Sequence, residues 1–391
     1  MGKYYNPTHP SDIVNENEFT GQIAGRVRWV YNRRYCFFRA NQLPFPIRVN
    51  VRLRRRFRSA AMSLCRLDGR LEQMTDRERE IVVRMMTVKE AVCSSMIDSD
   101  SPSIDDVLRH GKEEITEDSR SIKDIENYMN ALDFAFSDSS GSRKITSFTI
   151  SELHKRLMDT DKGRMQDPGE FRVDQNFIGT KYDTLETARF VPTDPMSLPS
   201  LMENLMKYIN TSPDDPLYKI ALAHYQFEIL HPMRDGNGRM GRLLTAAMMF
   251  SEGMMTYATV PFSEYLYEHR DEYHNKLFNI SAKDDFDSWF LMFLEAITTQ
   301  SDRTVRMLDN VLALRRKMLS EETNDHRRAV IEALFDNPYI TVSEVMERTG
   351  LTRPGALKLI SSMEEKGVIK EISGRMRGRV YLSESIRSAA Y

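Results

Sequence analysis

The chain of 391 residues has room for two or three domains. Its 55 lysines and arginines nearly balance 57 aspartates and glutamates, so no global field directs it to nucleic acid or to a membrane. Three widely separated cysteines indicate a reducing compartment and exclude a disulfide frame or a zinc knuckle. The first residues lack the apolar core of a signal peptide, and no run approaches 18 apolar residues. We therefore predict a cytoplasmic protein without a membrane span.

The first predicted unit, residues 1–58, is a basic and aromatic arm. Eleven arginines and no acidic residue lie between Arg26 and Arg58, with aromatic side chains such as Trp29 and Tyr35 among them. Interleaved basic and aromatic residues are typical of surfaces that bind single-stranded nucleic acid. The same pattern fits an amphipathic arm folded over an acidic face of its own protein, and the sequence leaves both interpretations open.

Apolar residues at helical spacing predict helices over residues 59–110. One stripe is formed by Ala60, Ala61, Leu64 and Leu67, and the next by Ile81, Val82, Met85 and Val88. The second helix runs into the serine-rich segment 94–99. Further helical patterns occupy residues 111–165, around a turn at 137–142. His154 lies in the last of them, where we expect a packing or surface group rather than a ligand.

Residues 231–242 read HPMRDGNGRMGR and lie between two apolar helical stretches. A loop pinned between two core helices holds its side chains rigidly. Gly236 and Gly238 allow the backbone to approach a ligand closely, because glycine lacks a Cβ atom. Their N–H groups, at the start of the helix near Arg239, form a concavity suited to phosphate oxygens.

The side chains of this loop complete a set suited to phosphate chemistry. Asn237 can donate into the same concavity, and Asp235 is a hard oxygen ligand for Mg²⁺. Arg239 and Arg242 share a helix face and can clamp further phosphate oxygens. His231 can take a proton from an attacking hydroxyl. A tight turn, a helix cap and solvated arginines would explain each residue alone. The complete set favours transfer at a nucleotide phosphorus.

This segment resembles the Fic family signature, His-Pro-Phe-x-Asp-Gly-Asn-Gly-Arg-x-x-Arg, at every polar position. Met233 replaces the family's Phe and can fill similar apolar volume less rigidly. Residues 168–172, 175–179 and 188–192 resemble the β-hairpin flap that covers the nucleotide and aligns the target backbone in that family. The resemblance extends over residues 60–300 and implies a mainly helical bundle with a small β-hairpin flap.

The resemblance implies a protein adenylyltransferase that moves AMP from ATP to a Ser, Thr or Tyr hydroxyl of a protein target or of itself. His231 would be the general base, and Asp235 would bind Mg²⁺. The remaining implied nucleotide contacts are Asn176, Phe177, Ile178, Gly179, Gly236, Asn237, Gly238, Arg239 and Arg242. Another nucleotide, a phosphocholine-type donor and removal of AMP stay open. So does a DNA-binding regulator that uses the Fic fold as a nucleotide sensor, although a sensor needs no base.

Residues 94–99 resemble the inhibitory motif of Fic proteins, Ser/Thr-x-x-x-Glu-Gly/Asn, placed before the catalytic core. In the family its glutamate pairs with the second motif arginine, here Arg242, and prevents productive seating of the γ-phosphate. Ser94 matches, whereas Asp98 and Ser99 depart from the motif. Because Asp is shorter than Glu by one methylene, we expect poorer pairing geometry or a bridging water. A serine-rich helix end without a regulatory role is the alternative.

The pattern changes after residue 300. We predict a Fic catalytic domain over 59–305 with its inhibitory helix near 90–99, a connecting helix and linker over 306–325, and a winged helix domain over 326–391. Ser343 is the predicted cap of the first helix of the helix-turn-helix. Basic residues occupy the predicted reading helix and wing, namely Arg353, Lys358, Arg375, Arg377 and Arg379. Winged helices also serve as protein-docking or dimer modules, so DNA, a protein partner and a homodimer all stay open.

Overall fold

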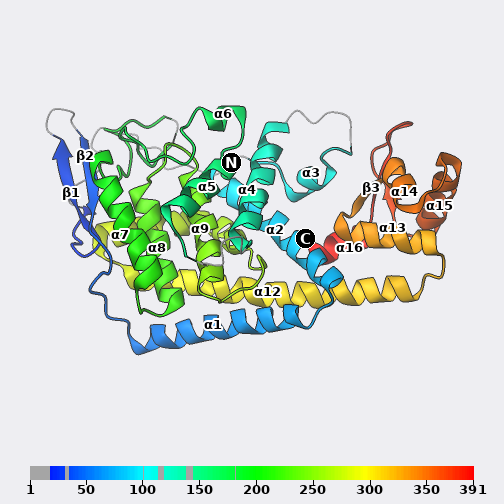
Figure 1. Ribbon diagram of the computed structural model, residues 1–391, viewed down its shortest axis with the longest axis horizontal. Coiled ribbons are helices and arrows are strands. Elements are labelled where there is room, and N and C mark those ends of the chain that lie inside the picture. Colours follow the sequence, from blue (N-terminus) through cyan, green and yellow to red (C-terminus); the bar gives the residue numbers. More distant parts are fainter. Residues whose placement is uncertain (1–17, 31–34, 100, 113–118, 138–143, 181) are drawn as a thin grey trace.

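The computed structural model describes residues 18–30, 35–99, 101–112, 119–137, 144–180 and 182–391. The described chain is mainly helical, with one two-stranded and one three-stranded antiparallel sheet. The predicted fold class is therefore confirmed. Two long helices, α1 (Val51–Glu72) and α12 (Phe286–Ser320), lie side by side along one edge of the molecule (Figure 1). Within the described ranges, no helix has the length and apolar character needed to cross a membrane.

The predicted N-terminal arm contains a β-hairpin followed by a helix. Strand β1 (Gly25–Val30) pairs with β2 (Tyr35–Ala40), and α1 begins after Asn50, whose side chain accepts from the Leu53 N–H. The predicted boundary at residue 58 thus falls inside α1, because buried residues at helical spacing continue upstream of it. Among the described residues, none of the arginines between positions 26 and 58 forms an ion pair.

The core of the molecule surrounds two consecutive helices, α8 (Pro216–Leu230) and α9 (Asn237–Ser251). Every residue of α8 after its first proline is buried, as expected of a helix enclosed on all sides. Helices α2 (Asp76–Asp98), α4 (Ser119–Phe136), α5 (Ser147–Leu157) and α7 (Leu198–Thr211) pack around this pair together with α1 and α12 (Figure 1). The remaining elements of this part of the chain are α3 (Ile104–Arg109), α6 (Asp161–Arg164), the 3₁₀ turn η3 (Pro195–Ser197), α10 (Phe262–Glu268) and α11 (Arg270–Lys283).

Helix α2 directs one polar face towards this core. It begins with a reciprocal capping box between Thr75 and Glu78 and ends at Asp98. Glu90, Ser94 and Asp98 follow one another at intervals of four residues, which places them on one side of the helix. Helix α2 contacts α4, α9 and α10, so Glu90 and Ser94 are buried between packed helices, whereas Asp98 at the end of the helix is exposed.

The C-terminal region has the order helix, helix-turn-helix and hairpin. Its elements are α13 (Asp325–Asp336), β3 (Tyr339–Thr341), α14 (Val342–Thr349), α15 (Arg353–Glu365), β4 (Lys370–Glu371), β5 (Val380–Leu382) and α16 (Glu384–Ala390), with strand order β3-β5-β4. The predicted cap Ser343 is wrong, because Thr341 forms a capping box with Glu344 and starts α14 earlier. Helix α12 is continuous from residue 286 to 320 and crosses the predicted boundary at 305.

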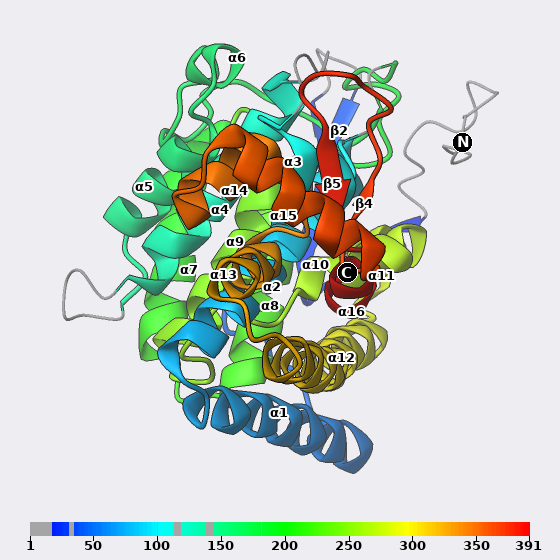
Figure 2. The same cartoon turned by 90° about the vertical axis from the view of Figure 1, so that its right-hand side faces the viewer.

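This C-terminal region packs against the rest of the chain (Figure 2). Asp105, near the start of α3, accepts from Tyr339 at 2.8 Å and pairs with Arg387. The side chain of Asn337 donates to the Leu108 carbonyl at 2.8 Å. Helix α3 therefore links the region that follows Asp98 to the winged unit through several polar contacts.

Candidate functional site

The predicted catalytic loop connects α8 to α9, and His231 lies where α8 ends. Its backbone is left-handed, with φ of 47°, and its N–H still bonds to the Phe227 carbonyl. The ring Nδ1 lies 3.3 Å from the Glu228 carbonyl oxygen. Since a carbonyl only accepts, Nδ1 carries the proton and Nε2 is left as a proton acceptor. Burial lowers the pKa of His231 to about 4, so the ring is neutral at pH 7.

The loop is held by contacts within itself and to the core. Met233 is fully buried, and its backbone N–H and carbonyl bond to the side chain of Asn237 at 2.8 and 2.9 Å. The amide of Asn237, predicted to donate into the anion concavity, thus fixes the loop. Gly236 has φ of 73°, and a Cβ atom there would lie 2.8 Å from the sulfur of Met158. Glycine is therefore required at this position on both grounds.

A buried histidine outside the motif also positions the loop. Nδ1 of His154 accepts from the Gly169 N–H at 2.8 Å, so its Nε2 carries the proton and donates to the Asp235 carbonyl at 3.0 Å. Burial lowers the pKa of His154, which favours this neutral form. The expectation that His154 only packs was incomplete, because it ties the loop to the start of the flap.

The predicted flap is joined to the catalytic loop by Arg172. This buried side chain donates from Nε to the His231 carbonyl at 2.9 Å and also contacts the Thr193 carbonyl. Asn176 donates more weakly to the carbonyls of His231 and Met233, at 3.4 and 3.3 Å. These contacts fix the orientation of the loop from the flap side.

The flap itself is held by one antiparallel bridge in the described chain, between Ile178 and Phe190. Phe177 packs against the cluster that includes Tyr35 and Val191, on the hairpin side. Gly179 is exposed beside Asp183. Asn176 is therefore adjacent to the loop and Phe177 to the hairpin, whereas Ile178 and Gly179 have their contacts within the flap. The contact of these four residues with a nucleotide stays a prediction.

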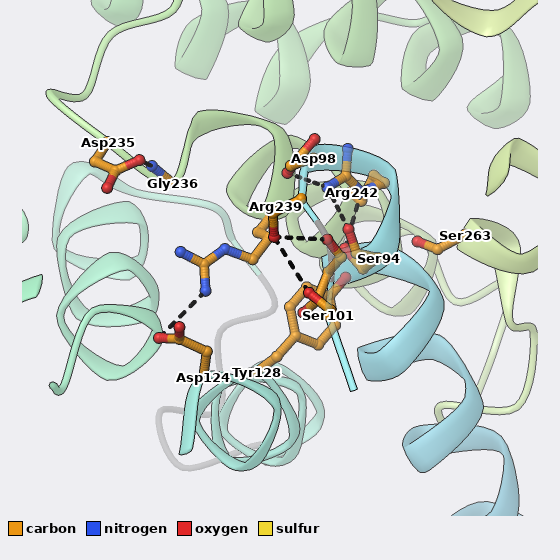
Figure 3. Close-up of polar contacts among 12 residues, drawn as sticks. Ser94, Asp98, Ser101, Asp124, Tyr128, Asp235, Gly236, Arg239, Arg242 and Ser263 are labelled. Carbon is orange, nitrogen blue, oxygen red and sulfur yellow. Dashed lines mark hydrogen bonds and ion pairs between the residues drawn. The ribbon is translucent and has the colours of Figure 1, made fainter. Parts of the chain in front are cut away.

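The second motif arginine, Arg242, is engaged by α2. Its side chain is 1% exposed and donates to Oδ2 of Asp98 at 2.6 Å. Its Nε and Nη2 also donate to the hydroxyl and the carbonyl of Ser94, both at 2.8 Å (Figure 3). The pair expected to form poorly or through water is direct, because the last turn of α2 lies against α9.

A second layer of buried groups lies around Arg242. Burial opposes its charge, but Asp98, Tyr273 and Glu228 outweigh this effect and hold the pKa of Arg242 above its ordinary value. Glu228 is buried, and its Oε1 has no hydrogen-bond partner among the described groups. Burial raises the pKa of Glu228 to about 8. A Cβ atom added at Gly241 would lie 2.1 Å from this Oε1, so the carboxyl sits directly against the start of α9.

The first motif arginine, Arg239, is held much more loosely. Its guanidinium lies 3.6 Å from Asp124 of α4 and contacts the Met158 sulfur. Figure 3 shows it directed towards Asp124, whereas Arg242 is directed towards Asp98 and Ser94. Only one half of the predicted arginine clamp is thus occupied by α2.

Asp235 is suited to hold a divalent cation with help from a ligand. It is exposed, and one carboxylate oxygen accepts from the Gly236 N–H at 2.7 Å. The described residues contain no cluster of three or more acidic, His or Cys side chains that could hold a metal by themselves. Mg²⁺ bound to nucleotides commonly takes one or two carboxylates together with phosphate oxygens and waters. A single exposed carboxylate beside the loop fits that pattern.

Sequence reasoning missed Arg172, Glu228 and Tyr273. Both Arg172 and Glu228 could have been found from their positions in the sequence. Arg172 lies within a segment that resembles the flap, and Glu228 lies three residues before His231. Tyr273 comes from α11; its hydroxyl is hydrogen-bonded to Nε2 of His224 at 2.9 Å and also interacts with Arg242. No sequence pattern linked Tyr273 to the motif.

Three segments of the chain match known protein families. Residues 144–249 match the Fic/DOC family, and residues 54–137 match the Fic/DOC family N-terminal region. The chain carries a Fic/DOC family domain. Residues 323–370 match the winged helix-turn-helix DNA-binding family.

Curated relatives and solved structures resemble parts of the chain. A probable protein adenylyltransferase of Aquifex aeolicus is 27% identical over 179 residues, covering 44% of this chain and 51% of the relative. The protein adenylyltransferase Fic of Drosophila erecta is 34% identical over 116 residues, covering 28% and 21%. The chain thus spans about half or less of these relatives' length. A Fic family protein from Desulfovibrio desulfuricans G20 shares the fold, with a TM-score of 0.54 at 19% identity over 86% of this chain and 97% of that one.

Proposed function

We propose that the chain is a protein adenylyltransferase that uses ATP and Mg²⁺. The observation that carries the proposal is a neutral His231, oriented through Nδ1 and free to accept a proton at Nε2, at the head of a loop that ends in a glycine-rich helix start. The Fic/DOC match over 144–249 and the names of the distant relatives support it.

In this reaction Nε2 of His231 takes the proton from the target hydroxyl while its oxygen attacks the α-phosphorus of ATP. A new P–O bond forms, the bond to the β-phosphate oxygen breaks, and pyrophosphate leaves. The N–H groups at the start of α9 and Arg239 stabilise negative charge on the phosphates. Asp235 would hold Mg²⁺, which neutralises phosphate charge when bound. The low pKa of His231 means that transfer is lost only as pH falls towards about 4, when Nε2 becomes protonated.

We also propose that Ser94 and Asp98 restrain the enzyme. They occupy the Arg242 guanidinium that the ATP γ-phosphate would otherwise engage. The Fic signature alone leaves other nucleotides or removal of AMP as alternatives, because its residues contact phosphates rather than the base.

The His231→Ala variant tests the catalytic role. We expect transfer to fall by roughly 10²–10⁴-fold, because the base acts only on the attacking hydroxyl, while ATP binding is retained. The measurement is incorporation of label from α-labelled ATP, with γ-labelled ATP as a control for phosphoryl transfer. His326→Ala is the matched control and should keep wild-type transfer, because His326 is an exposed histidine near the start of α13 in the C-terminal region. Wild-type transfer by His231→Ala would refute the assignment.

DNA binding by the C-terminal region is a second proposed function. The region matches a DNA-binding winged helix family, and Arg353 and Lys358 are exposed at the start of α15. Removing one cation that binds a DNA phosphate should flatten the dependence of log K on log salt by about 0.9. The Arg353→Ser, Lys358→Ser double variant should therefore bind duplex DNA more weakly and with a slope smaller by about two. An unchanged slope would remove α15 from the interface.

A further inference from the structure

A pocket of about 390 Å³ lies between the β1–β2 hairpin and the start of α7. The residues that line it are Arg26, Arg28, Arg39, Ala40, Asn41, Gln42, Ser197, Ser200 and Leu201. The hairpin thus contributes three guanidinium groups, and the opposite wall contributes two hydroxyl groups. None of these residues belongs to the catalytic loop or to the arginine clamp.

The three arginines lie on one face of the hairpin, so their positive charges repel one another. Arg26 lies directly opposite Arg39 in the antiparallel register, and Arg28 follows two residues along on the same face. Like charges placed opposite each other destabilise a sheet. Within the described chain, none of the three pairs with a carboxylate, and the pocket lining contains no acidic residue. Nearby Asp194 accepts instead from the N–H and the hydroxyl of Ser197.

This arrangement suits an oxyanion supplied from outside the chain. Guanidinium groups bind carboxylates and phosphates through charge-assisted, often bidentate hydrogen bonds. The amide of Gln42 can add a neutral donor, whereas Asn41, Ser197 and Ser200 already donate within the chain. The described residues that line the pocket include no aromatic side chain, so they offer no stacking surface of the kind that single-stranded nucleic acid requires.

The pocket is connected to the catalytic loop through the flap. The Ala40 N–H, on the pocket wall, donates to the Thr193 hydroxyl at 3.0 Å, and the neighbouring Phe38 N–H donates to the Val191 carbonyl at 2.8 Å. The Thr193 carbonyl contacts Arg172, which in turn donates to the His231 carbonyl at 2.9 Å. Strand β2 therefore lies beside residues 191–193, at the end of the flap. The flap is the segment along which a target chain is expected to align.

We propose that this pocket binds an acidic segment of the protein target, near the hydroxyl that receives AMP. The inference rests on the proposed adenylyltransferase function, and it adds a substrate class to it. Aspartate or glutamate side chains of the target would neutralise Arg26, Arg28 and Arg39. The pocket then selects targets whose modified hydroxyl is flanked by acidic residues.

Fluorescence anisotropy of a labelled peptide tests the proposal. The probe contains one Thr within a glutamate-rich segment, and a peptide with Gln at every Glu position is its control. The Arg26→Ser, Arg39→Ser variant should bind the glutamate peptide at least roughly tenfold more weakly, because two guanidinium groups that bind carboxylates are removed. The matched control is Arg52→Ser, Arg54→Ser, which removes two exposed arginines of α1 outside the pocket and should bind normally.

Three outcomes would overturn the proposal. They are equal binding of the Gln peptide, equal weakening in both double variants, and a labelled oligothymidine that binds better than the glutamate peptide and depends on Arg26 and Arg39.

Repeating the peptide-binding measurement with the His231→Ala variant separates the pocket hypothesis from the adenylyltransferase hypothesis, since peptide binding needs no base. Transfer to the Thr peptide should show a raised KM at similar kcat in the pocket variant. A failure of all transfer with intact peptide binding would reject the enzyme assignment alone.

Discussion

Two arginines one turn apart on α9 have opposite environments. Arg242 is buried and donates three short hydrogen bonds to α2, whereas among the described residues Arg239 has a 3.6 Å approach to Asp124 and a sulfur contact. Loose ion pairs contribute little, while a buried, hydrogen-bonded guanidinium is strongly coupled to its partners. Under the proposed restraint, α2 would therefore act on one arginine of the clamp and leave the other available to phosphate.

The Asp98→Asn variant should have the largest effect. It removes the carboxylate charge that we propose competes with phosphate for Arg242, and it keeps the shape of the side chain. We expect self-modification to rise by roughly ten- to a hundredfold, since a charge-assisted contact is worth about 1.5–3 kcal/mol. The measurement is the initial rate of AMP incorporation at saturating Mg²⁺.

Asp124→Asn applies the same chemical change to the other arginine. Its expected effect is less than about fivefold, because a longer, more exposed pair contributes under about 1 kcal/mol. If both variants respond equally, or if Asp98→Asn leaves the rate unchanged, the end of α2 is only a helix terminus.

An effect on ATP affinity is expected from Glu228. Burial raises its pKa to about 8, so it is neutral at pH 7 and ionises as pH rises through 8. The new charge would compete with phosphate for Arg242. We expect ATP affinity to fall by roughly fivefold, or about 1 kcal/mol, between pH 7 and 9, and this fall to vanish in Glu228→Gln.

The same group makes the fold sensitive to pH. In the unfolded chain a glutamate ionises near 4.5, so the free energy of unfolding should decrease as pH rises from about 4.5 to about 8. Denaturant unfolding across this range measures it. Glu252→Gln, at the far end of α9, is the control and should keep the native pH profile. A pH-independent ATP affinity in the native chain would exclude Glu228 from this role.

The sequence predicted features that depend on local pattern. The loop 231–242, the two helices around it and the winged unit follow from spacing and turn chemistry. Thr341-x-x-Glu344 is itself a capping-box pattern, so the misplaced start of α14 was avoidable. The direct Asp98–Arg242 contact was not predictable, because its geometry depends on how closely α2 packs on α9. The same holds for His154 and Glu228, whose partners come from other helices or the backbone.

The left-handed backbone of His231 has a consequence for the stability of this protein. A side chain with Cβ in that conformation costs about 1–2 kcal/mol relative to glycine, and histidine cannot recover it from its weak 3.3 Å ring contact. Selection for thermal stability alone would therefore replace this residue with glycine or asparagine. Substitutions that raise the stability of the fold and retention of the proposed base thus oppose each other at this position. A chain that has lost its activity could reach a more stable fold by a single substitution of His231.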